Sequence, residues 1–387
     1  MKVLLVGNLP DDRQESMRRF TDLMSAGLTA RGHRVSQLSP RLQIARLAGA
    51  YQYRGLPKYL GYLDKFILFP RELRAHIAQT RPDVVHIIDH SNAVYATAAS
   101  AAPVLVTCHD LLQVRAALGE VPQQRVSAFG RRYQNWILRS LGRVPRVACV
   151  SAKTREDVLR LTPLSPERIS VVPNALNHPY RPLEHAVARE RVAELAAANG
   201  VDASRLSPGK GGFLLNVGGA HWYKNRPGLF AIYAELRRRI MPTPTLVMVG
   251  PRLSAQEAAQ VATLELNEHL IVFSSLTNDQ LEGLYSLAEG LIFPSWEEGF
   301  GWPIAEAQAC GCPVFTSNRA PMTEVGGSAG VYFDPAEPAD AARIIAAAWP
   351  TRSTQRSRGL EEVRRWNPDA MFASYEKIYA ELAATKR

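Results

Sequence analysis

The sequence predicts an α/β protein of two doubly wound domains, for three reasons. The chain has 387 residues, of which 46% are hydrophobic, which is too long and too apolar for one ordinary core. Short β-branched runs alternate with helical segments along both halves, as in parallel sheets covered by helices. Glycine-rich and polar segments follow several of these runs, where open α/β sheets bind ligands. We therefore expect two domains that face each other across a ligand cleft.

The first domain is expected over residues 1–174. A run from Val3 to Val6 opens it, a helical pattern from Phe20 to Leu28 follows, and a second run begins at Val35. These three segments form one βαβ unit. Further strands of this domain are expected at residues 84–88, 104–107, 147–150 and 169–172.

The second domain is expected over residues 175–368, with the same alternation of strands and helices. Its strands are expected at residues 213–217, 245–249, 270–273, 291–293, 314–315 and 331–333. The tail, residues 369–387, has an apolar stripe at helical spacing. The stripe consists of Phe372, Tyr375, Ile378, Tyr379 and Leu382.

Charge is distributed unevenly between the two halves. Residues 1–185 contain 26 Lys and Arg against 14 Asp and Glu, a net +12, whereas the remainder has 20 against 22, a net −2. This predicts either an anionic partner for the first half, such as a phosphorylated acceptor, acidic lipid headgroups or nucleic acid, or only a proteome rich in arginine.

Several classes of protein are disfavoured by the sequence. No apolar run reaches the roughly 18 residues of a membrane span, and the opening residues lack a signal-peptide core, which favours the cytoplasm. The four cysteines are too few for a disulfide scaffold, and we interpret them as reduced packing residues. Neither half contains the Gly-x-Gly-x-x-Gly fingerprint, which argues against an NAD or FAD enzyme.

The most informative segment is residues 294–314, directly after an expected strand. Gly299 and Gly301 permit close approach of a ligand to the backbone, and Pro303 suits the first turn of a helix. Glu298 then lies in the loop and Glu306 near the helix start. Free N–H groups at that start suit a phosphate and a carboxylate suits paired sugar hydroxyls, so the segment fits a nucleotide-sugar.

This segment resembles the Glu-x7-Glu motif of glycosyltransferase family 4, whose members are retaining enzymes of the GT-B fold. In that fold the last helix crosses back to the first domain, which is what the resemblance implies for the tail. It further implies that Glu298 contacts hydroxyls of the donor sugar and that Glu306 binds the ribose. Phe300 and Gly301 would contribute backbone amides to the sugar or its phosphate.

Residues 217–225 are similar to the diphosphate-binding loop of the family. Gly218, Gly219 and Asn225 belong to this loop, and Lys224 would neutralise the departing diphosphate. Many members have an arginine a few residues before the lysine, and this chain has none there. Phosphate stabilisation is then shared with Arg226 or left to helix amides.

Residues 107–110 resemble the Thr-x-His-Asp segment of the family. By this resemblance His109 would act near the donor sugar and the acceptor hydroxyl, with Asp110 as its structural partner. The family's first loop corresponds to Gly7, and backbone near Leu276 is expected to meet the nucleotide base. No Asp-x-Asp occurs, so we expect neither a metal nor a cofactor beyond the nucleotide-sugar co-substrate.

The acceptor side has a weaker signature. Tyr53 and Lys58 belong to an aromatic and basic stretch at residues 51–66, which fits an acceptor site, a membrane-surface patch or a packed helix pair. We expect a carbohydrate or lipid-linked saccharide acceptor, with peripheral membrane contact through the basic first half and no nucleic acid.

Two rival functions are left open at this stage. A GT-B-like sugar-nucleotide epimerase would need no acceptor, and a basic binding protein with a vestigial sugar site would have no turnover.

Overall fold

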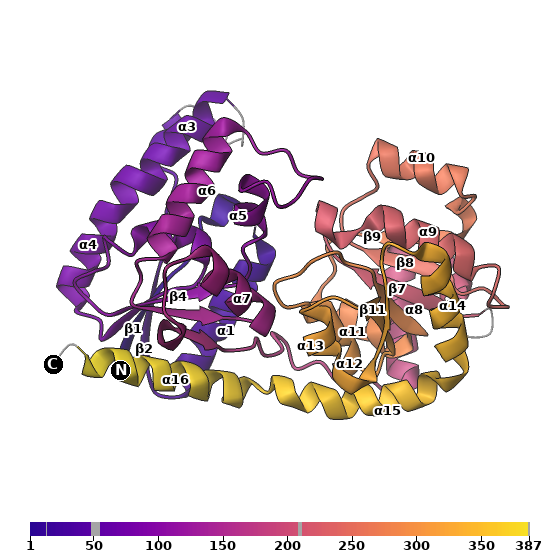
Figure 1. Cartoon of the computed structure of the whole chain (residues 1–387). Coiled ribbons are helices and arrows are strands. Elements are labelled where there is room, and N and C mark those ends of the chain that lie inside the picture. Colours follow the sequence, from indigo (N-terminus) through magenta and orange to yellow (C-terminus); the bar gives the residue numbers. More distant parts are fainter. Residues whose placement is uncertain (13, 48–54, 208–210, 386–387) are drawn as a thin grey trace. The chain divides into compact units, whose positions relative to one another are not determined.

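The computed structural model describes all residues except 13, 48–54, 208–210 and 386–387. The described chain forms two compact units, of which unit 1 comprises Met1–Asn177 and Pro368–Arg387, and unit 2 comprises His178–Asn367. The expected boundaries lay at residues 174 and 368. The C-terminal segment belongs to unit 1, although it follows unit 2 in sequence (Figure 1).

Unit 1 is built on a six-stranded parallel sheet with the order β2-β1-β3-β4-β5-β6. The strands are β1 (Lys2–Val6), β2 (Arg34–Leu38), β3 (Val84–Ile87), β4 (Val104–Cys108), β5 (Arg146–Cys149) and β6 (Ile169–Val171). Strands β3 and β4 are buried along their whole length, because helices cover both faces of a parallel sheet. The strand order reverses between β1 and β3, which makes that point the topological switch of unit 1.

Except for the C-terminal helix, the helices of unit 1 connect successive strands. They are α1 (Glu15–Ala30), α2 (Ile44–Leu47), α3 (Gly55–Leu63), α4 (Phe69–Thr80), α5 (Leu112–Ala117), α6 (Ala128–Leu141), α7 (Ala152–Leu161) and α16 (Pro368–Ala384). A π-helix, η2 (Asp64–Leu68), joins α3 to α4, and a 3-10 segment, η3 (His90–Tyr95), follows β3. Helix α1 buries Phe20, Met24 and Leu28, the face that its helical spacing predicts.

Unit 2 repeats the design with a second parallel sheet, in the order β12-β11-β10-β7-β8-β9. Its strands are β7 (Phe213–Val217), β8 (Thr245–Val249), β9 (Leu270–Phe273), β10 (Gly290–Phe293), β11 (Val314–Ser317) and β12 (Gly330–Phe333). Its main helices are α8 (His185–Ala198), α9 (Arg226–Leu236), α10 (Ala255–Thr263), α11 (Asn278–Leu287), α12 (Trp302–Ala309), α13 (Met322–Gly326), α14 (Pro338–Ala348) and α15 (Arg352–Glu362). The switch point of this sheet lies between β7 and β10.

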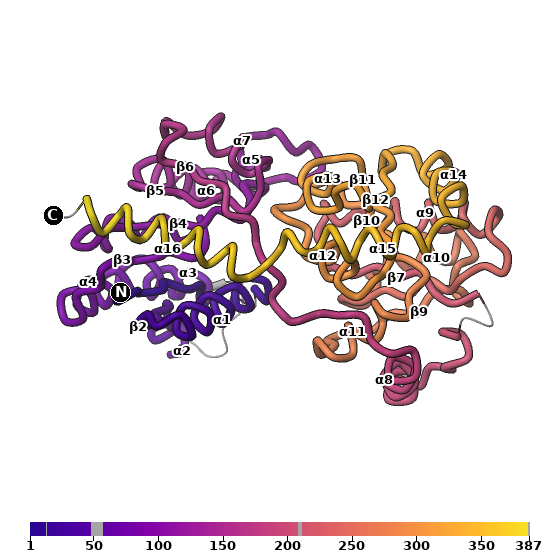
Figure 2. Tube along the Cα trace, turned by 90° about the horizontal axis from the view of Figure 1, so that it is seen from below, coloured from indigo at the N-terminus to yellow at the C-terminus, as the bar shows by residue number. Residues whose placement is uncertain are grey.

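Helix α16 packs against the sheet of unit 1 (Figures 1 and 2). All five residues of its predicted apolar stripe are buried. The hydroxyl of Tyr379 lies 2.7 Å from Nδ1 of His86 in β3, and Nε2 of His86 lies 2.7 Å from the Thr107 hydroxyl in β4. At the surface, Arg31 donates to both Glu376 and Asp369. The C-terminal helix is thus an integral part of unit 1.

Candidate functional site

Two of the predicted site residues lie on loops that follow neighbouring strands of unit 2. Lys224 follows β7 and Glu298 follows β10, and these strands are paired across the switch point. Because both strands run parallel, their carboxyl ends meet at one edge of the sheet. Sequence positions 74 residues apart are thereby brought to a single place.

The loop after β7 is held in a specific conformation by Asn225. This residue adopts φ +52°, caps α9 by accepting from the Gly228 N–H, and is buried. Lys224 immediately precedes it, and the lysine stem passes over Gly218. A Cβ at Gly218 would lie 3.2 Å from Lys224 Cδ, so a small residue is favoured here.

Three contacts join this loop to the loop after β10. The Trp296 N–H donates to the Tyr223 carbonyl at 2.7 Å, and Asn225 Nδ2 donates to the Pro294 carbonyl at 3.0 Å. The third is an ion pair in which Lys224 Nζ lies 2.7 Å from Glu298 Oε1. Asn225 is predicted to contact the donor, but both its side-chain oxygen and its side-chain nitrogen form hydrogen bonds that position these loops.

The Lys224–Glu298 pair is largely shielded from water. The lysine side chain is 16% exposed and the glutamate side chain 9% exposed. Lys224 Nζ also lies 5.0 Å from the centre of the Phe293 ring, where the ring face attracts a cation. Because part of the lysine side chain is exposed to solvent, the lysine can exchange its carboxylate partner for another anion.

Glu306 lies in the second turn of α12 and is 3% exposed. Its Oε2 accepts a hydrogen bond from the Tyr285 hydroxyl of α11 at 2.9 Å. Burial, with the charge of Glu306, raises the pKa of Tyr285 far above its usual value, so the phenol stays a donor. Sequence patterns do not point to Tyr285, because it lies on another helix and outside every motif.

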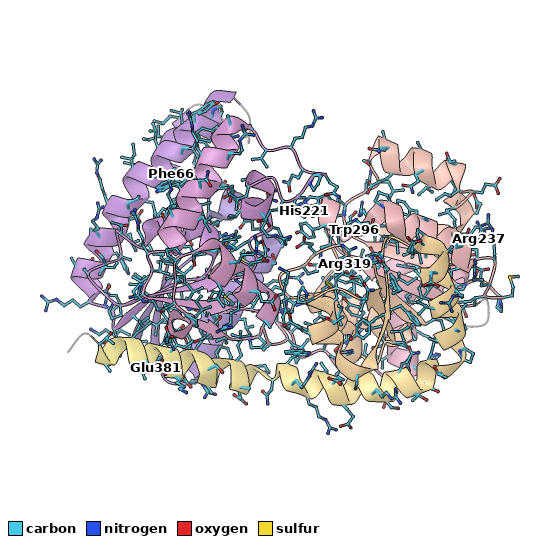
Figure 3. All side chains as sticks on the ribbon, in the orientation of Figure 1. Phe66, His221, Arg237, Trp296, Arg319 and Glu381 are labelled. Carbon is cyan, nitrogen blue, oxygen red and sulfur yellow. The ribbon has the colours of Figure 1, made fainter. Side chains whose placement is uncertain are left out.

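The backbone at the beginning of α12 has a left-handed conformation at a glycine. Gly301 adopts φ +99° at the N-cap position, a conformation that few side chains tolerate, and no side chain caps the helix. The side chain of Phe300 turns inward, with its ring edge-on to Trp366 at 5.2 Å. Nearby, the guanidinium of Arg319 stacks over Trp296 at 4.8 Å (Figure 3).

Arg226, named above as an alternative phosphate contact, is held elsewhere. It is 3% exposed, its Nη2 donates to the Pro251 carbonyl at 2.7 Å, and its Nη1 lies 3.4 Å from Glu257. The guanidinium therefore braces the loop after β8. Leu276 is half-buried in the loop after β9, next to Ser275 with φ +56°. Gly219 is half-buried beside the His221 ring.

In unit 1, His109 and Asp110 directly follow β4. His109 is 6% exposed, its Nε2 lies 3.0 Å from the Ile88 carbonyl, and its ring meets Phe20 edge-on at 4.7 Å. Burial lowers the pKa of His109, against the raising effect of Asp89, so the ring is neutral near pH 7. Asp110 accepts from the Leu112 N–H and shapes the turn into α5.

A polar cluster that sequence reasoning missed lies at the switch point of unit 1. Asn8 Nδ2 donates to Asp89 Oδ2 at 2.6 Å, and Asn92 Nδ2 donates to Asn8 Oδ1 at 2.8 Å. Asp89 lies two residues after the end of β3, as Asp110 lies two residues after the end of β4, and that repeated position is the signal that could have identified it. Gly7 lies at the same point, where an added Cβ would be 2.5 Å from the Ser39 hydroxyl.

The weaker candidates are only partly described. Tyr53 lies outside the described residues, whereas Lys58 is half-buried, with Nζ 6.0 Å from the centre of the Tyr62 ring. Within the described part of the chain, His178, Asp279 and Glu282 form one group close enough to share a metal. Glu282 is already bound by Arg191 and the Arg181 N–H, and the group is separate in sequence from the loops of Lys224 and Glu298. The four cysteines are free and buried.

Comparison with models of known protein families shows which family this chain belongs to. Residues 17–178 match the model of Glycosyltransferase Family 4, and residues 201–358 match that of Glycosyl transferases group 1. The chain belongs to glycosyltransferase family 4. The matches cover most of both units, which agrees with the family that the motifs of the sequence indicate.

Curated relatives of this family 4 chain include bacterial sugar transferases. It is 26% identical over 285 residues to the serotype-specific mannosyltransferase WbdA of Escherichia coli, a match that covers 70% of this chain and 33% of the relative. It is 27% identical over 253 residues to O-antigen chain mannosyltransferase B of the same organism, covering 64% of this chain and 62% of the relative. The chain thus spans less than two thirds of either relative.

Solved structures confirm the two-domain GT-B fold of the family 4 chain. Sucrose-phosphate synthase from Thermosynechococcus elongatus superposes over 100% of both chains with a TM-score of 0.75 at 18% identity. WaaG, a glycosyltransferase involved in lipopolysaccharide biosynthesis, matches 94% of this chain and 95% of its own with a TM-score of 0.67 at 16% identity. At such identities the likeness shows the fold alone.

Proposed function

We propose that the chain transfers a hexose-type sugar from a nucleotide diphosphate sugar to an acceptor hydroxyl, with retention of anomeric configuration. The observation that carries this proposal is the Lys224–Glu298 pair, which brings the two motif loops together at the switch point of unit 2. The mannosyltransferase names of the curated relatives support a hexose, in polysaccharide or glycolipid biosynthesis.

The donor is proposed to bind along the edge formed by β7, β10 and their neighbours. Lys224 would hold the diphosphate, a charge-assisted contact that contributes about 1.5–3 kcal/mol. Glu298 would then be released toward the sugar hydroxyls. Glu306 would accept from the ribose, with the Tyr285 hydroxyl fixing its carboxylate.

Backbone groups are proposed to complete donor binding. Gly218 and Gly219 leave room beside the diphosphate, because any side chain at Gly218 would crowd the Lys224 stem. The uncapped start of α12, at Phe300 and Gly301, offers N–H groups to the donor. The loop at Leu276 would meet the base, and Gly7 the phosphate.

The proposed chemistry needs no protein nucleophile. The bond between the anomeric carbon and the phosphate oxygen breaks, and its electron pair leaves with the diphosphate. The acceptor oxygen forms the new bond on the same face, and its proton passes to the departing phosphate. We propose that positive charge at Lys224, rather than a metal, stabilises the leaving group. His109 is proposed to orient the reacting sugar, with Asp110 as its structural support.

The proposed acceptor is a carbohydrate or a lipid-linked saccharide, with Lys58 and Tyr53 on the acceptor side and no role for nucleic acid. We place the enzyme in the cytoplasm with peripheral contact to the inner face of a membrane. Among the described residues, no helix is both long and apolar enough to cross a bilayer. The basic charge of the first half supports contact with an anionic surface.

Substitution of the ion pair tests the donor site. We expect Lys224→Ala and Glu298→Ala each to lower turnover by about 100-fold or more while folding survives, as measured by nucleotide diphosphate release. The double variant Lys224→Met/Glu298→Gln leaves no unpaired charge, so it should regain stability without regaining turnover. Arg352→Ala breaks a similar pair with Glu289 in unit 2 and should leave turnover unchanged.

Two outcomes would contradict this assignment. Near-normal turnover in both single variants would remove the pair from the reaction. Release of nucleotide diphosphate in the absence of any acceptor, at the rate seen with it, would favour an epimerase or a hydrolase instead.

A further inference from the structure

Unit 1 exposes a group of large apolar side chains on two neighbouring helical segments. We call this group the α3–α6 patch, since its members lie on α3, the following π-helix and α6. They are Tyr59 (60% exposed), Leu63 (38%), Ile67 (44%), Phe129 (51%) and Trp136 (43%). A group of exposed large apolar side chains of this kind marks an interaction site.

Ring contacts through Tyr62 and Phe66, which stack on each other at 5.7 Å, link the aromatic members of the patch. The Tyr62 ring stacks on Phe129 at 5.6 Å and contacts Tyr59 at 6.3 Å. The Phe66 ring meets Trp136 edge-on at 5.0 Å. Helices α3 and α6 lie side by side (Figure 1), and Phe66 lies where they meet (Figure 3).

Helix α6 carries aromatic and basic side chains along a single stripe. Phe129, Arg132, Trp136 and Arg139 follow one another along α6 at intervals of three and four residues, which places them on one face, and Arg143 lies two residues beyond the helix end. All five are exposed. In the described part of the chain, none of the three arginines is paired with a carboxylate, and residues 121–155 contain no Asp or Glu at all. The stripe is therefore apolar and positively charged together.

A groove continues from the stripe. It has a volume of about 680 Å³ and is lined by Trp136, Arg139 and Arg143 together with apolar groups such as Val94 and Ala96. Val104, which begins β4, and Val144, which precedes β5, also line the groove. The groove therefore lies toward the amino ends of the strands. It is distinct from the carboxyl edge that carries His109.

We propose that the α3–α6 patch docks on an anionic lipid bilayer. The aromatic rings would lie at the headgroup level, Leu63 and Ile67 would enter the acyl boundary, and the three arginines would contact lipid phosphates. Exposed aliphatic side chains fit a bilayer better than a nucleic acid, which is bound by stacking and cations. The inference rests on the membrane contact within the proposed function and not on its sugar chemistry.

Vesicle sedimentation of the full chain tests the patch. We expect wild type to sediment with phosphatidylcholine vesicles that contain phosphatidylglycerol, and about tenfold less with phosphatidylcholine alone. The apolar variant Phe129→Ser/Trp136→Ser and the charge variant Arg132→Gln/Arg139→Gln/Arg143→Gln should each weaken binding about tenfold or more. The charge variant changes only exposed side chains, so it keeps the test valid if the apolar variant fails to fold.

Matched controls come from exposed residues of unit 2. Arg189→Gln/Arg252→Gln/Arg358→Gln removes the same net charge, and Val187→Ser/Met241→Ser removes exposed apolar groups. Both should bind vesicles like wild type. The proposal is overturned if wild type ignores anionic vesicles, if patch and control variants lose binding equally, or if the patch variants only dissociate a dimer. Turnover with a soluble acceptor, measured on the same proteins, should be unchanged, which separates failure of docking from failure of the proposed transfer.

Discussion

Tyr285 and Glu306 form a buried pair in which a neutral phenol supports a carboxylate. Their hydrogen bond is 2.9 Å long, and both side chains are nearly or fully buried. We expect Tyr285→Phe to lower the stability of unit 2 by about 1.5–3 kcal/mol, because the lost bond was made to a charged group. The thermal unfolding midpoint checks this.

Tyr233→Phe is the matched control for this residue. Tyr233 is as deeply buried, but its hydroxyl faces two neutral backbone carbonyls, that of Pro244 at 2.7 Å and that of His269 at 3.2 Å. Loss of a bond to a neutral acceptor costs about 0.5–1.5 kcal/mol. If Tyr285→Phe destabilised no more than Tyr233→Phe, the carboxylate at Glu306 would not depend on the phenol.

Some residues of the candidate site can be recognised from local sequence motifs, and others only from the structure. Lys224, Glu298 and Glu306 were predicted because each belongs to a local motif after a strand. Tyr285 and Asp89 were not, since their role comes from a hydrogen bond to a distant segment. The assignment of Lys224, Glu298 and Glu306 to the donor stays a prediction, because ligand contacts depend on a bound nucleotide-sugar.

At the scale of elements, helices α1 and α16 pack at very close range. An added Cβ at Gly27 would lie only 1.9 Å from the Phe372 ring. Alanine ordinarily stabilises a helix relative to glycine, by about 1 kcal/mol. Here we expect Gly27→Ala to destabilise unit 1 by about 1–3 kcal/mol, because overpacking outweighs helix propensity. Thermal unfolding measures the sign.

A double substitution distinguishes crowding from other causes. Phe372→Ala alone should cost about 3–5 kcal/mol through the cavity that it leaves. In the Gly27→Ala/Phe372→Ala variant the new methyl meets no ring, so the loss should be smaller than the sum of the two single losses. Strict additivity would show that the two residues are not coupled through this contact.

Element boundaries agree closely with the sequence pattern, and one difference is informative. Strand β11 was expected at residues 314–315 but continues to Ser317. Thr316 and Ser317 are buried, and their hydroxyls donate to the Phe293 and Ser295 carbonyls. Hydroxyl residues thus extend a buried strand when neighbouring backbone accepts their hydrogen bonds, which a pattern of apolar runs does not reveal.

At the scale of the whole molecule, acid sensitivity should arise in unit 1. Burial, with a contribution from His109, lowers the pKa of His86 to about 3. Since the unfolded chain binds this proton near pH 6.5 and the folded chain does not, stability is full above pH 6.5 and falls as pH drops toward 3. The slope should approach about 1.4 kcal/mol per pH unit from this one group.

Comparison with His86→Gln isolates that contribution. We expect the wild type to lose more stability between pH 6.5 and 4.5 than the variant, by calorimetry. The carboxyl of Glu376 adds little to the pH dependence of stability above pH 4.5. Hydrogen bonding from Arg31 lowers its pKa below 4.5, so its stabilising effect is lost only at lower pH. Equal pH slopes in both proteins would show that His86 does not control acid unfolding.

The sequence by itself determined the two α/β sheets, their strands and the family. Those properties follow from local alternation, from turn residues and from motifs that lie within about ten residues. Only the tertiary structure decided that Lys224 pairs with Glu298, that Arg226 braces the loop after β8, and that apolar and basic side chains of α3 and α6 share one surface. The physical reason is that such contacts form between segments far apart in sequence, where packing and burial select partners that no local pattern specifies.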